Sequence, residues 1–345
     1  MRAPGGALER LPAAAAFHRT VGFVFDEVGS ELPSKTAGEL EHLQREERAR
    51  HLIVSGTLRR VRECLLGAGV PFLVVKGPVL AALAYSRPRL RSYRDLDLIV
   101  PRSRFADALQ AFESEGADVI DPNWRYLFDE VAGEVELTTG VDLHWHFLFS
   151  ESVRRATKVR MEEIFERARR ATVGGMEILT PDAPDTLIHL ALHACKEGGD
   201  RLIWLKDIEQ AVLNDKPSWR DVVDRALDWR VNLFVGAILL RARRVLHAPV
   251  PDEVLGALIP NRPWRRLLHS LDVLFPIDIW TGCETPATIA VRATRADAPR
   301  TLEFIGRAAL SRARNGVRSG ARPAGRFTAT AEARTAFLDR IASGS

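Results

Sequence analysis

Residues 94–100 read Arg-Asp-Leu-Asp-Leu-Ile-Val, a pair of aspartates that runs into an apolar segment. The branched apolar residues and the alternating pattern predict a strand over Asp95–Val100. Side chains two residues apart in a strand share a face, so Asp95 and Asp97 are expected to project together. Two adjacent carboxylates repel each other unless a cation joins them, and Mg²⁺ suits oxygen ligands. Solvated aspartates paired with nearby arginines would also explain the pattern.

A second motif lies upstream, where an apolar, β-branched run over Val70–Val75 predicts a buried strand. Lys76 and Gly77 follow directly, and Pro78 suits the first turn of a helix. A glycine at such a turn lets a phosphate approach the backbone, where the helix N-terminus offers N–H donors. Lys76 adds a positive charge for a phosphate. An ordinary strand-to-helix turn with a surface lysine is the alternative.

A third motif, Val-Asp-Leu-His-Trp-His, occupies residues 141–146 and falls within a strand candidate over Val135–His146. In a regular strand Asp142 shares a face with His144 and His146. A carboxylate on a neighbouring strand can complete a metal site or take a proton from an acceptor hydroxyl. An edge strand with polar outward positions fits the same alternation.

The remaining pattern predicts an α+β fold, with a mixed β-sheet and flanking helices followed by an α-helical domain. The first 36 residues are expected to be loosely ordered with one short helix, residues 37–180 to form the α+β domain, 181–290 the helical domain and 291–345 a basic C-terminal segment. Helices are expected over Ala37–Leu66, Val79–Tyr85, Arg102–Glu115, Met161–Arg170, Asp185–Glu197, Leu202–Asn214, Trp219–Trp229, Val231–His247 and Pro251–Leu258, further strands over Ala117–Ile120 and Tyr126–Glu130, and a hairpin around Gly174-Gly175.

These motifs, in this order, resemble the DNA polymerase β-type nucleotidyltransferase superfamily. The segments FLVVKGPVLAALAY (72–85), RSYRDLDLIV (91–100), VDLHWHF (141–147) and HLALHACKEGGDRLIWLKDIEQ (189–210) resemble a bacterial branch described only as nucleotidyltransferase family proteins. The resemblance covers about residues 50–215. It differs from most of the superfamily at the turn, where Gly77-Pro78 replaces a glycine–serine pair whose hydroxyl binds a phosphate.

The resemblance implies a mechanism in which Asp95 and Asp97 bind two Mg²⁺ ions, with Mn²⁺ as a substitute. It implies that Asp142 binds the catalytic metal and helps to activate the attacking hydroxyl, and that Gly77 contacts the phosphates through its backbone. Such catalysis consists mainly of positioning and charge neutralisation. Further nucleotide-binding candidates are Lys76, Arg94, His193, Lys196 and Arg201; a solvated pair of helices would equally explain the last three.

Composition sets outer limits on the function. The 345 residues carry a formal net charge of +4, and from Val291 onward 11 arginines face four acidic residues. This excess predicts a solvated basic end; a nucleic-acid partner is possible but not favoured, because no aromatic residues interleave with the arginines. The cysteines Cys64, Cys195 and Cys283 are odd in number and far apart, which favours a reduced, cytoplasmic setting, and no membrane span is expected.

The sequence therefore predicts a Mg²⁺-dependent nucleotidyltransferase that transfers a nucleotidyl group from an NTP such as ATP to an acceptor and releases pyrophosphate. Some members of the resembling branch occur in gene clusters for modified peptides or polysaccharides, which implies a role in natural-product biosynthesis and a peptide, sugar or small-molecule acceptor. A degenerate nucleotide-binding adaptor and a phosphoryl or glycosyl-phosphate transferase remain alternatives.

Overall fold

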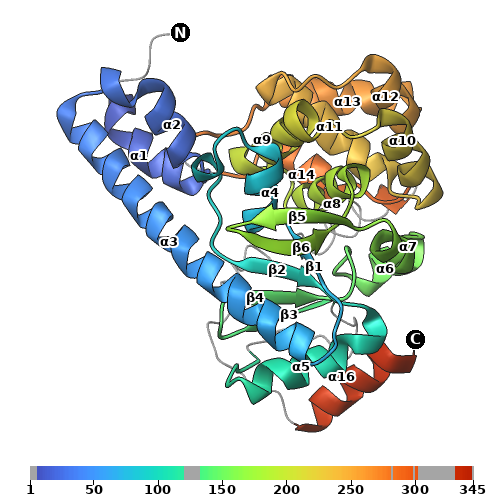
Figure 1. Ribbon diagram of the computed structural model, residues 1–345. Coiled ribbons are helices and arrows are strands. Elements are labelled where there is room, and N and C mark those ends of the chain that lie inside the picture. Colours follow the sequence, from blue (N-terminus) through green and yellow to red (C-terminus); the bar gives the residue numbers. More distant parts are fainter. Residues whose placement is uncertain (1–5, 120–132, 281–282, 298–299, 302–330, 344–345) are drawn as a thin grey trace.

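The computed structural model describes residues 6–119, 133–280, 283–297, 300–301 and 331–343, and Figure 1 shows how their elements are arranged. The helical elements are α1 (Ala7–Phe17), α2 (Val21–Val28), η1 (Gly29–Glu31), α3 (Ser34–Gly67), α4 (Gly77–Ala84), η2 (Pro88–Leu90), η3 (Arg102–Arg104), α5 (Phe105–Ser114), α6 (Glu151–Ala156), α7 (Met161–Glu166), α8 (Ala183–Lys196), α9 (Leu202–Gln210), η5 (Ala211–Asp215), α10 (Trp219–Asp228), α11 (Asn232–Leu246), α12 (Asp252–Leu258), α13 (Arg262–Leu274), α14 (Pro286–Ala293) and α16 (Ala331–Ser343). The strands are β1 (Leu73–Val75), β2 (Leu96–Ile99), β3 (Glu134–Leu137), β4 (Val141–His144), β5 (Arg169–Val173) and β6 (Met176–Thr180).

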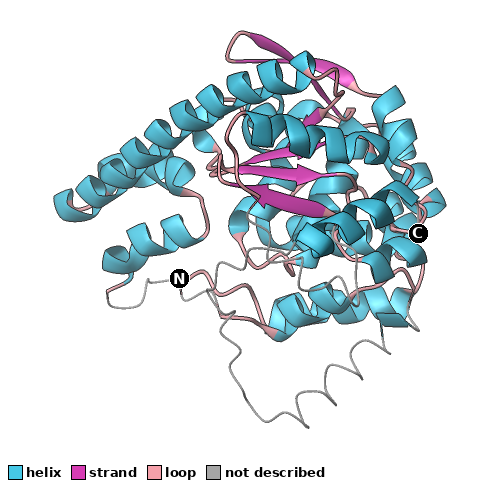
Figure 2. Cartoon of the chain, turned by 90° about the horizontal axis from the view of Figure 1, so that it is seen from below, coloured by secondary structure: helices cyan, strands magenta, loops and turns pink. Residues whose placement is uncertain are grey.

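The central element is a mixed sheet of four strands in the order β1-β2-β4-β3. Strand β2 runs antiparallel to β1 and parallel to β4, and β3 runs antiparallel to β4. The pairing places Asp97 opposite Val75 on one side and opposite Asp142 on the other. Figure 2 shows these short strands enclosed by helices. The expected α+β fold, with a helical half after the sheet, is confirmed.

The two faces of this sheet differ in chemistry because successive side chains of a strand point to opposite sides. On one face, Leu96, Leu98 and Leu143 are fully buried in a core that they share with α3 and α5. On the other face stand the polar residues Asp97 and Asp142, next to apolar residues that pack with the helical half. One face is therefore purely structural, and the other is free to carry chemistry.

The first helices form a layer at the end of the long helix α3, as Figure 1 shows in blue. The first 36 residues, expected to hold one short helix, contain both α1 and α2. Ala15 and Val21 pack with Leu40 of α3 in a small core of their own. The sequence pattern missed this because Ala15 lies in an alanine-rich stretch, and burial of small side chains leaves little periodic signal.

The helical half follows the sequence closely. Each predicted helix from Asp185 to Leu258 is present, with ends that shift by one or two residues, except that the last residues of the second form the π-helical turn η5. The hairpin expected around Gly174-Gly175 is the pair β5–β6. Among the residues that the structure describes, no helix has the length and apolar character that a membrane crossing requires.

The strand pattern between α5 and α6 was predicted less well. Val135–His146, one candidate in the sequence, is two antiparallel strands, because Gly140 adopts a left-handed φ of 70° in a tight turn. Val119 forms only an isolated bridge with Leu137. The candidate at Tyr126–Glu130 lies outside the described residues.

The C-terminal helix α16 returns to the sheet half and packs beside α5, as the red helix of Figure 1 shows. Phe337 is 1% exposed and its ring meets that of Phe105 at 6.1 Å. Arg334 forms a 2.6 Å ion pair with Glu113, and Arg102 donates to the carbonyl of Arg340. This part of the basic end is therefore an integral part of the core.

A buried ion pair joins the sheet half to the helical half. Arg91, before β2, donates through Nε and Nη2 to both carboxylate oxygens of Asp207 in α9, each at 2.8 Å. The hydroxyl of Tyr85 donates to the same carboxylate at 2.5 Å. Burial alone would lower the pKa of Arg91, but the carboxylate of Asp207 outweighs that effect and raises it. Asp207 is therefore a structural tie between the two halves.

Replacing Asp207 by alanine should destabilise the protein strongly, because the guanidinium of Arg91 would stay buried without its partner. The expected loss in unfolding free energy is about 3–5 kcal/mol, measured by urea denaturation. Asp252, which pairs with Arg243 but has an 88% exposed side chain, is the control, and Asp252→Ala should cost no more than about 1 kcal/mol. Equal losses in the two variants would contradict the assigned role.

Candidate functional site

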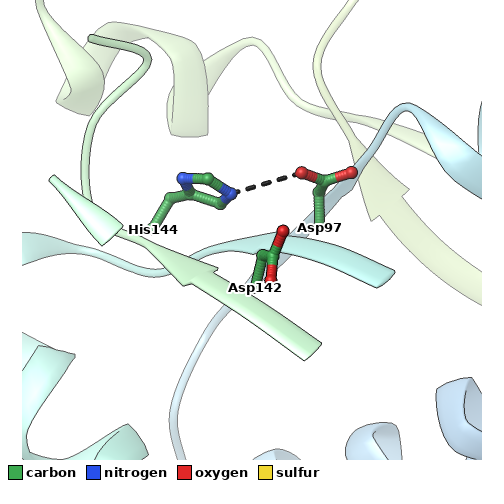
Figure 3. A group of neighbouring side chains, drawn as sticks. All are labelled: Asp97, Asp142 and His144. Carbon is green, nitrogen blue, oxygen red and sulfur yellow. Dashed lines mark hydrogen bonds and ion pairs between the residues drawn. The ribbon is translucent and has the colours of Figure 1, made fainter. Parts of the chain in front are cut away.

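Three side chains converge on the polar face of the sheet: Asp97 from β2, and Asp142 and His144 from β4 (Figure 3). Because β2 and β4 are parallel and in register, Asp97 lies directly opposite Asp142, and His144 follows two positions along the same face. One ligand atom from each residue lies within 4.8 Å of the others. His144 Nε2 lies 3.3 Å from Asp97 Oδ1. The sheet register therefore creates a compact set of possible metal ligands.

Asp97 is the electrostatic centre of this group. It is 5% exposed, and its Oδ1 lies 2.7 Å from the Nζ atom of Lys76. Burial by itself disfavours the charged carboxylate, but Lys76 and His144 outweigh it and hold the pKa of Asp97 well below its usual range. Asp97 is therefore ionised at neutral pH, as a metal ligand must be.

Lys76 reaches Asp97 from a strained turn. Strand β1 ends at Val75, and Lys76 adopts φ 51° and ψ −138° before α4 begins at Gly77. Such a conformation is unfavourable for a residue with a Cβ, and strain of this kind concentrates at functional sites. Gly77 also has a positive φ, of 36°, and Arg91 donates from Nη1 to its carbonyl at 3.2 Å. The turn is thus held by the ion pair of Lys76 with Asp97 and by the hydrogen bond from Arg91 to the carbonyl of Gly77.

The helical half contributes His193, which α8 places 3.5 Å from the Nζ atom of Lys76. Burial, and next the charge of Lys76, hold the pKa of His193 well below its usual value, so its ring is neutral at pH 7. Lys196 lies one helical turn further along α8, and its charge also lowers the pKa of His193. Its Nζ atom lies 4.8 Å from the ring centre of Phe149. Of the residues predicted to bind nucleotide, His193 and Lys76 are in contact.

Three other predicted site residues, Asp95, Arg94 and Arg201, lie near the turn at Gly77 and not at the carboxylates of Asp97 and Asp142. Strand β2 begins at Leu96, so Asp95 precedes it and strand alternation does not fix its direction. A Cβ on Gly77 would lie 3.5 Å from the carbonyl oxygen of Asp95, so these two residues are adjacent. The side chains of Asp95, Arg94 and Arg201 all act electrostatically on Arg19, a residue that lies in none of the sequence motifs.

The histidines of the third motif separate. His144 joins the carboxylates, whereas His146 lies beyond the end of β4 and accepts a hydrogen bond from the backbone N–H of Leu148 at 2.9 Å. Burial lowers the pKa of His146 to about 3, so it is a neutral structural group. Strand periodicity could place His144 beside Asp142, but it could not show that the strand ends before His146.

The donor set fits a divalent cation. Two carboxylates and an imidazole supply one ligand atom each, and the described residues contain this one group of at least three potential ligands within such distances. The two carboxylates suit Mg²⁺ and Mn²⁺, whereas an imidazole is a more usual ligand of zinc, iron, nickel and copper. The ammonium of Lys76 now balances Asp97, so a metal would share that carboxylate with it.

A family model described as "Uncharacterised nucleotidyltransferase" matches residues 6–247. The chain belongs to this nucleotidyltransferase family. The match includes the sheet, α8, α9 and α11, so it contains every candidate site residue named above. The resemblance inferred from the motifs is therefore confirmed, and membership supports a transferase that acts by nucleotidyl transfer.

A solved structure of the antibiotic-resistance factor ANT(2″)-Ia, a solution structure that reveals substrate-regulated conformational dynamics, is also similar. It shares 12% sequence identity, and the match covers 52% of this chain and 91% of that chain with a TM-score of 0.36. No curated protein gives a significant match.

Backbone strain at Lys76 predicts an unusual order of stability between two variants. Lys76→Gly and Lys76→Ala both remove the ion pair with Asp97, but only glycine adopts φ 51° without strain. Lys76→Gly should therefore be the more stable variant by about 1 kcal/mol or more, despite the greater freedom of glycine in the unfolded chain. Urea denaturation of both variants measures the difference. A more stable alanine variant would show that the turn is unstrained.

The lowered pKa of His146 predicts a specific loss of stability in acid. The unfolded chain takes up a proton near the ordinary value of 6.5, whereas the folded protein does so only near 3. The unfolding free energy should therefore fall as the pH drops below 6.5, by about 2 kcal/mol from this group between pH 7 and pH 5.

His146→Gln should lose that part of the pH dependence while the other histidines keep theirs. Urea denaturation of both proteins in EDTA, at pH 7 and pH 5, measures it. An identical decline in wild type and variant would mean that His146 is protonated in the folded protein.

Proposed function

We propose that this protein catalyses Mg²⁺- or Mn²⁺-dependent transfer of a nucleotidyl group from an NTP to an acceptor hydroxyl or phosphate, with release of pyrophosphate. The observation that carries the proposal is the alignment of Asp97 and Asp142 on adjacent parallel strands beside Lys76, in a chain of the nucleotidyltransferase family. In this reaction the acceptor oxygen bonds to the α-phosphorus, the bond from that phosphorus to the β-phosphate oxygen breaks, and the acceptor loses a proton.

Each residue of the site has a distinct role in this proposal. Asp97, Asp142 and His144 would hold the divalent cation, which supplies positive charge to the phosphates of the substrate. Asp142 is the proposed acceptor of the proton from the attacking hydroxyl. Lys76 would exchange part of its contact with Asp97 for a phosphate oxygen, because its ammonium can serve either anion.

The predicted ligand Asp95 has a different setting from Asp97. Asp95 is half-buried, precedes β2 and acts electrostatically on Arg19. Its role as a ligand of a second ion remains a proposal. Lys196 and His193 likewise remain proposed nucleotide contacts at the C-terminal end of α8.

The acceptor and the setting of the reaction are proposed from the resemblance. A peptide, a sugar or another small molecule with a free hydroxyl or phosphate is the expected acceptor class, in a cytoplasmic biosynthetic reaction. A panel of peptides, sugar phosphates and nucleosides, offered with each of the four common NTPs and with Mg²⁺ or Mn²⁺, would identify the pair. Pyrophosphate release is the readout, and the mass added to the acceptor identifies the transferred group.

With the best substrate pair, Asp97→Asn and Asp142→Asn should each lower the rate of pyrophosphate release by at least about a hundredfold, because each removes one charged ligand. Asp224→Asn, which changes a 65% exposed carboxylate on α10, should retain the wild-type rate. Circular dichroism verifies that the variants fold. Full activity in both site variants would contradict the proposed site.

Two observations favour a second function, that of a nucleotide-binding adaptor without catalysis. The ammonium of Lys76 is already in contact with Asp97, and Pro78 stands where a phosphate-binding serine is usual in the superfamily. Calorimetry with each NTP, in the presence and absence of Mg²⁺, distinguishes the two functions. Tight nucleotide binding with no pyrophosphate release from any acceptor in the panel would favour the adaptor.

A further inference from the structure

Arg19 stands out in the turn between α1 and α2. It has a left-handed φ of 54°, which costs energy in a residue with a Cβ. Its Nε atom is buried and has no hydrogen-bond partner among the described residues. A charged group whose donor is shielded from water without a partner is costly, so its placement calls for an explanation beyond packing.

The fold holds Arg19 in place through its neighbour His18. The Nδ1 atom of His18 accepts a hydrogen bond from the backbone N–H of Leu202 at 3.2 Å, and the carbonyl of His18 accepts one from Ile203 at 3.2 Å. These contacts satisfy donors at the start of α9 and fix the α1–α2 turn against it. Arg201, the residue before α9, lies with its guanidinium 5.0 Å from the ring centre of Phe17.

The docking of the α1–α2 turn against α9 brings several positively charged arginines together. The groups that act electrostatically on Arg19 are Asp95, Arg201, Arg94 and Arg91. Arg91 is committed to Asp207, and no ion pair is found for Arg19, Arg94 or Arg201 among the described residues. Burial lowers the pKa of Arg19. The charges of the neighbouring arginines lower it further, whereas the charge of Asp95 acts in the opposite direction.

Two carboxylates near these arginines balance part of the charge. Asp95 is one, and Glu47 of α3 is the other, since Arg50, Arg94 and Arg19 all act on it. Glu47 also accepts a hydrogen bond from the hydroxyl of Ser92. Counting Arg50, four guanidinium groups face these two carboxylates. A third carboxylate, Asp200, interacts with Arg201 but also pairs with Arg292 at 3.8 Å, so positive charge stays in excess.

This excess of positive charge lies next to the strained turn at Lys76 and Gly77. Asp95 is adjacent to Gly77, and Arg91, which holds the carbonyl of Gly77, is itself one of the neighbours of Arg19. An anion bound at the arginines would therefore border the turn from which Lys76 reaches Asp97. Guanidinium groups match the oxygens of a phosphate because their planar N–H donors can bind two oxygens at once.

We infer that Arg19, Arg94 and Arg201 form a second anion site, which binds the polyphosphate part of the nucleotide beside the turn at Gly77. The inference rests on the proposed function for the identity of this ligand, a nucleoside triphosphate. Arg19 is a substrate-binding residue supplied by the segment before the sheet, and phosphate oxygens would offer its guanidinium the acceptors that the described residues do not supply to Nε.

The test measures binding of inorganic tripolyphosphate by calorimetry, in EDTA and at low salt, so that neither a metal nor a base contributes. Wild-type protein should bind it, and Arg19→Gln should raise the Kd by about tenfold or more, as expected for loss of a charged hydrogen-bond donor. Arg94→Gln, at an exposed position where folding is spared, should also raise the Kd. Arg60→Gln removes the same charge from an exposed position on α3 and should bind like the wild type.

Two further measurements separate this inference from the proposed function. Asp97→Asn should bind tripolyphosphate at least as tightly as the wild type, because it alters the carboxylate group and not the arginines. If transfer fails for every acceptor but Arg19→Gln still weakens tripolyphosphate binding, the anion site stands and the proposed function does not.

If transfer is observed and Arg19→Gln leaves the KM for the nucleotide unchanged, the inference is overturned and the function stands. No tripolyphosphate binding by the wild type, or equal binding by the Arg19→Gln, Arg94→Gln and Arg60→Gln variants, overturns it as well. Circular dichroism establishes that each variant is folded; if Arg19→Gln is not, Arg94→Gln decides the outcome.

Discussion

The carboxylate of Asp97 is ionised although it is almost fully shielded from water, and this state depends on partners from separate parts of the chain. Lys76 supplies a full positive charge from the turn after β1, and His144 supplies a ring nitrogen from β4. His193 approaches Lys76 from α8. An isolated buried charge would cost several kcal/mol, so the positions of β1, β2, β4 and α8 are mutually dependent. The site is thus also a point at which the sheet and the helical half are held together.

The buried ion pair between Arg91 and Asp207 stabilises the same arrangement of sheet and helices. Its bidentate geometry fixes α9 against the segment that leads into β2, and the remaining donor of Arg91 fixes the carbonyl of Gly77. One guanidinium therefore contacts both α9 of the helical half and the turn that carries Lys76. Buried pairs of this kind contribute little net stability compared with apolar packing, but losing one partner is expensive. This property makes the pair effective in specifying one arrangement.

The site has two ends of different chemistry. The carboxylates and His144 form an acidic end suited to a cation, and the arginines around Arg19 form a basic end suited to an anion. The proposed substrate, a metal-bound nucleoside triphosphate, carries both kinds of charge and would satisfy both ends. The docking of the α1–α2 turn on α9 through His18 would allow the N-terminal helices to take part in the proposed site. The family match begins at residue 6 and therefore includes them.

Local sequence was sufficient for much of the fold. The helical periodicity from Asp185 onward, the β-branched run that contains β1 and the apolar run after Asp95 predicted their elements within a few residues, because side-chain burial repeats with the period of each element. The same periodicity put Asp142 and His144 on one face. It failed between Val135 and His146, where one glycine turn divides a uniform pattern into two strands.

Only the tertiary structure decided which of the selected residues meet. The parallel register of β2 and β4 joined Asp97 to Asp142, and α8 brought His193 to Lys76 across 117 positions. The sequence determined that a strand, a glycine turn and paired acids are present, because these are local properties of the chain. The contacts of Arg91 with Asp207 and of His18 with α9 were decided by packing, because a charge or a hydrogen-bond donor finds its partner only when the whole chain has folded.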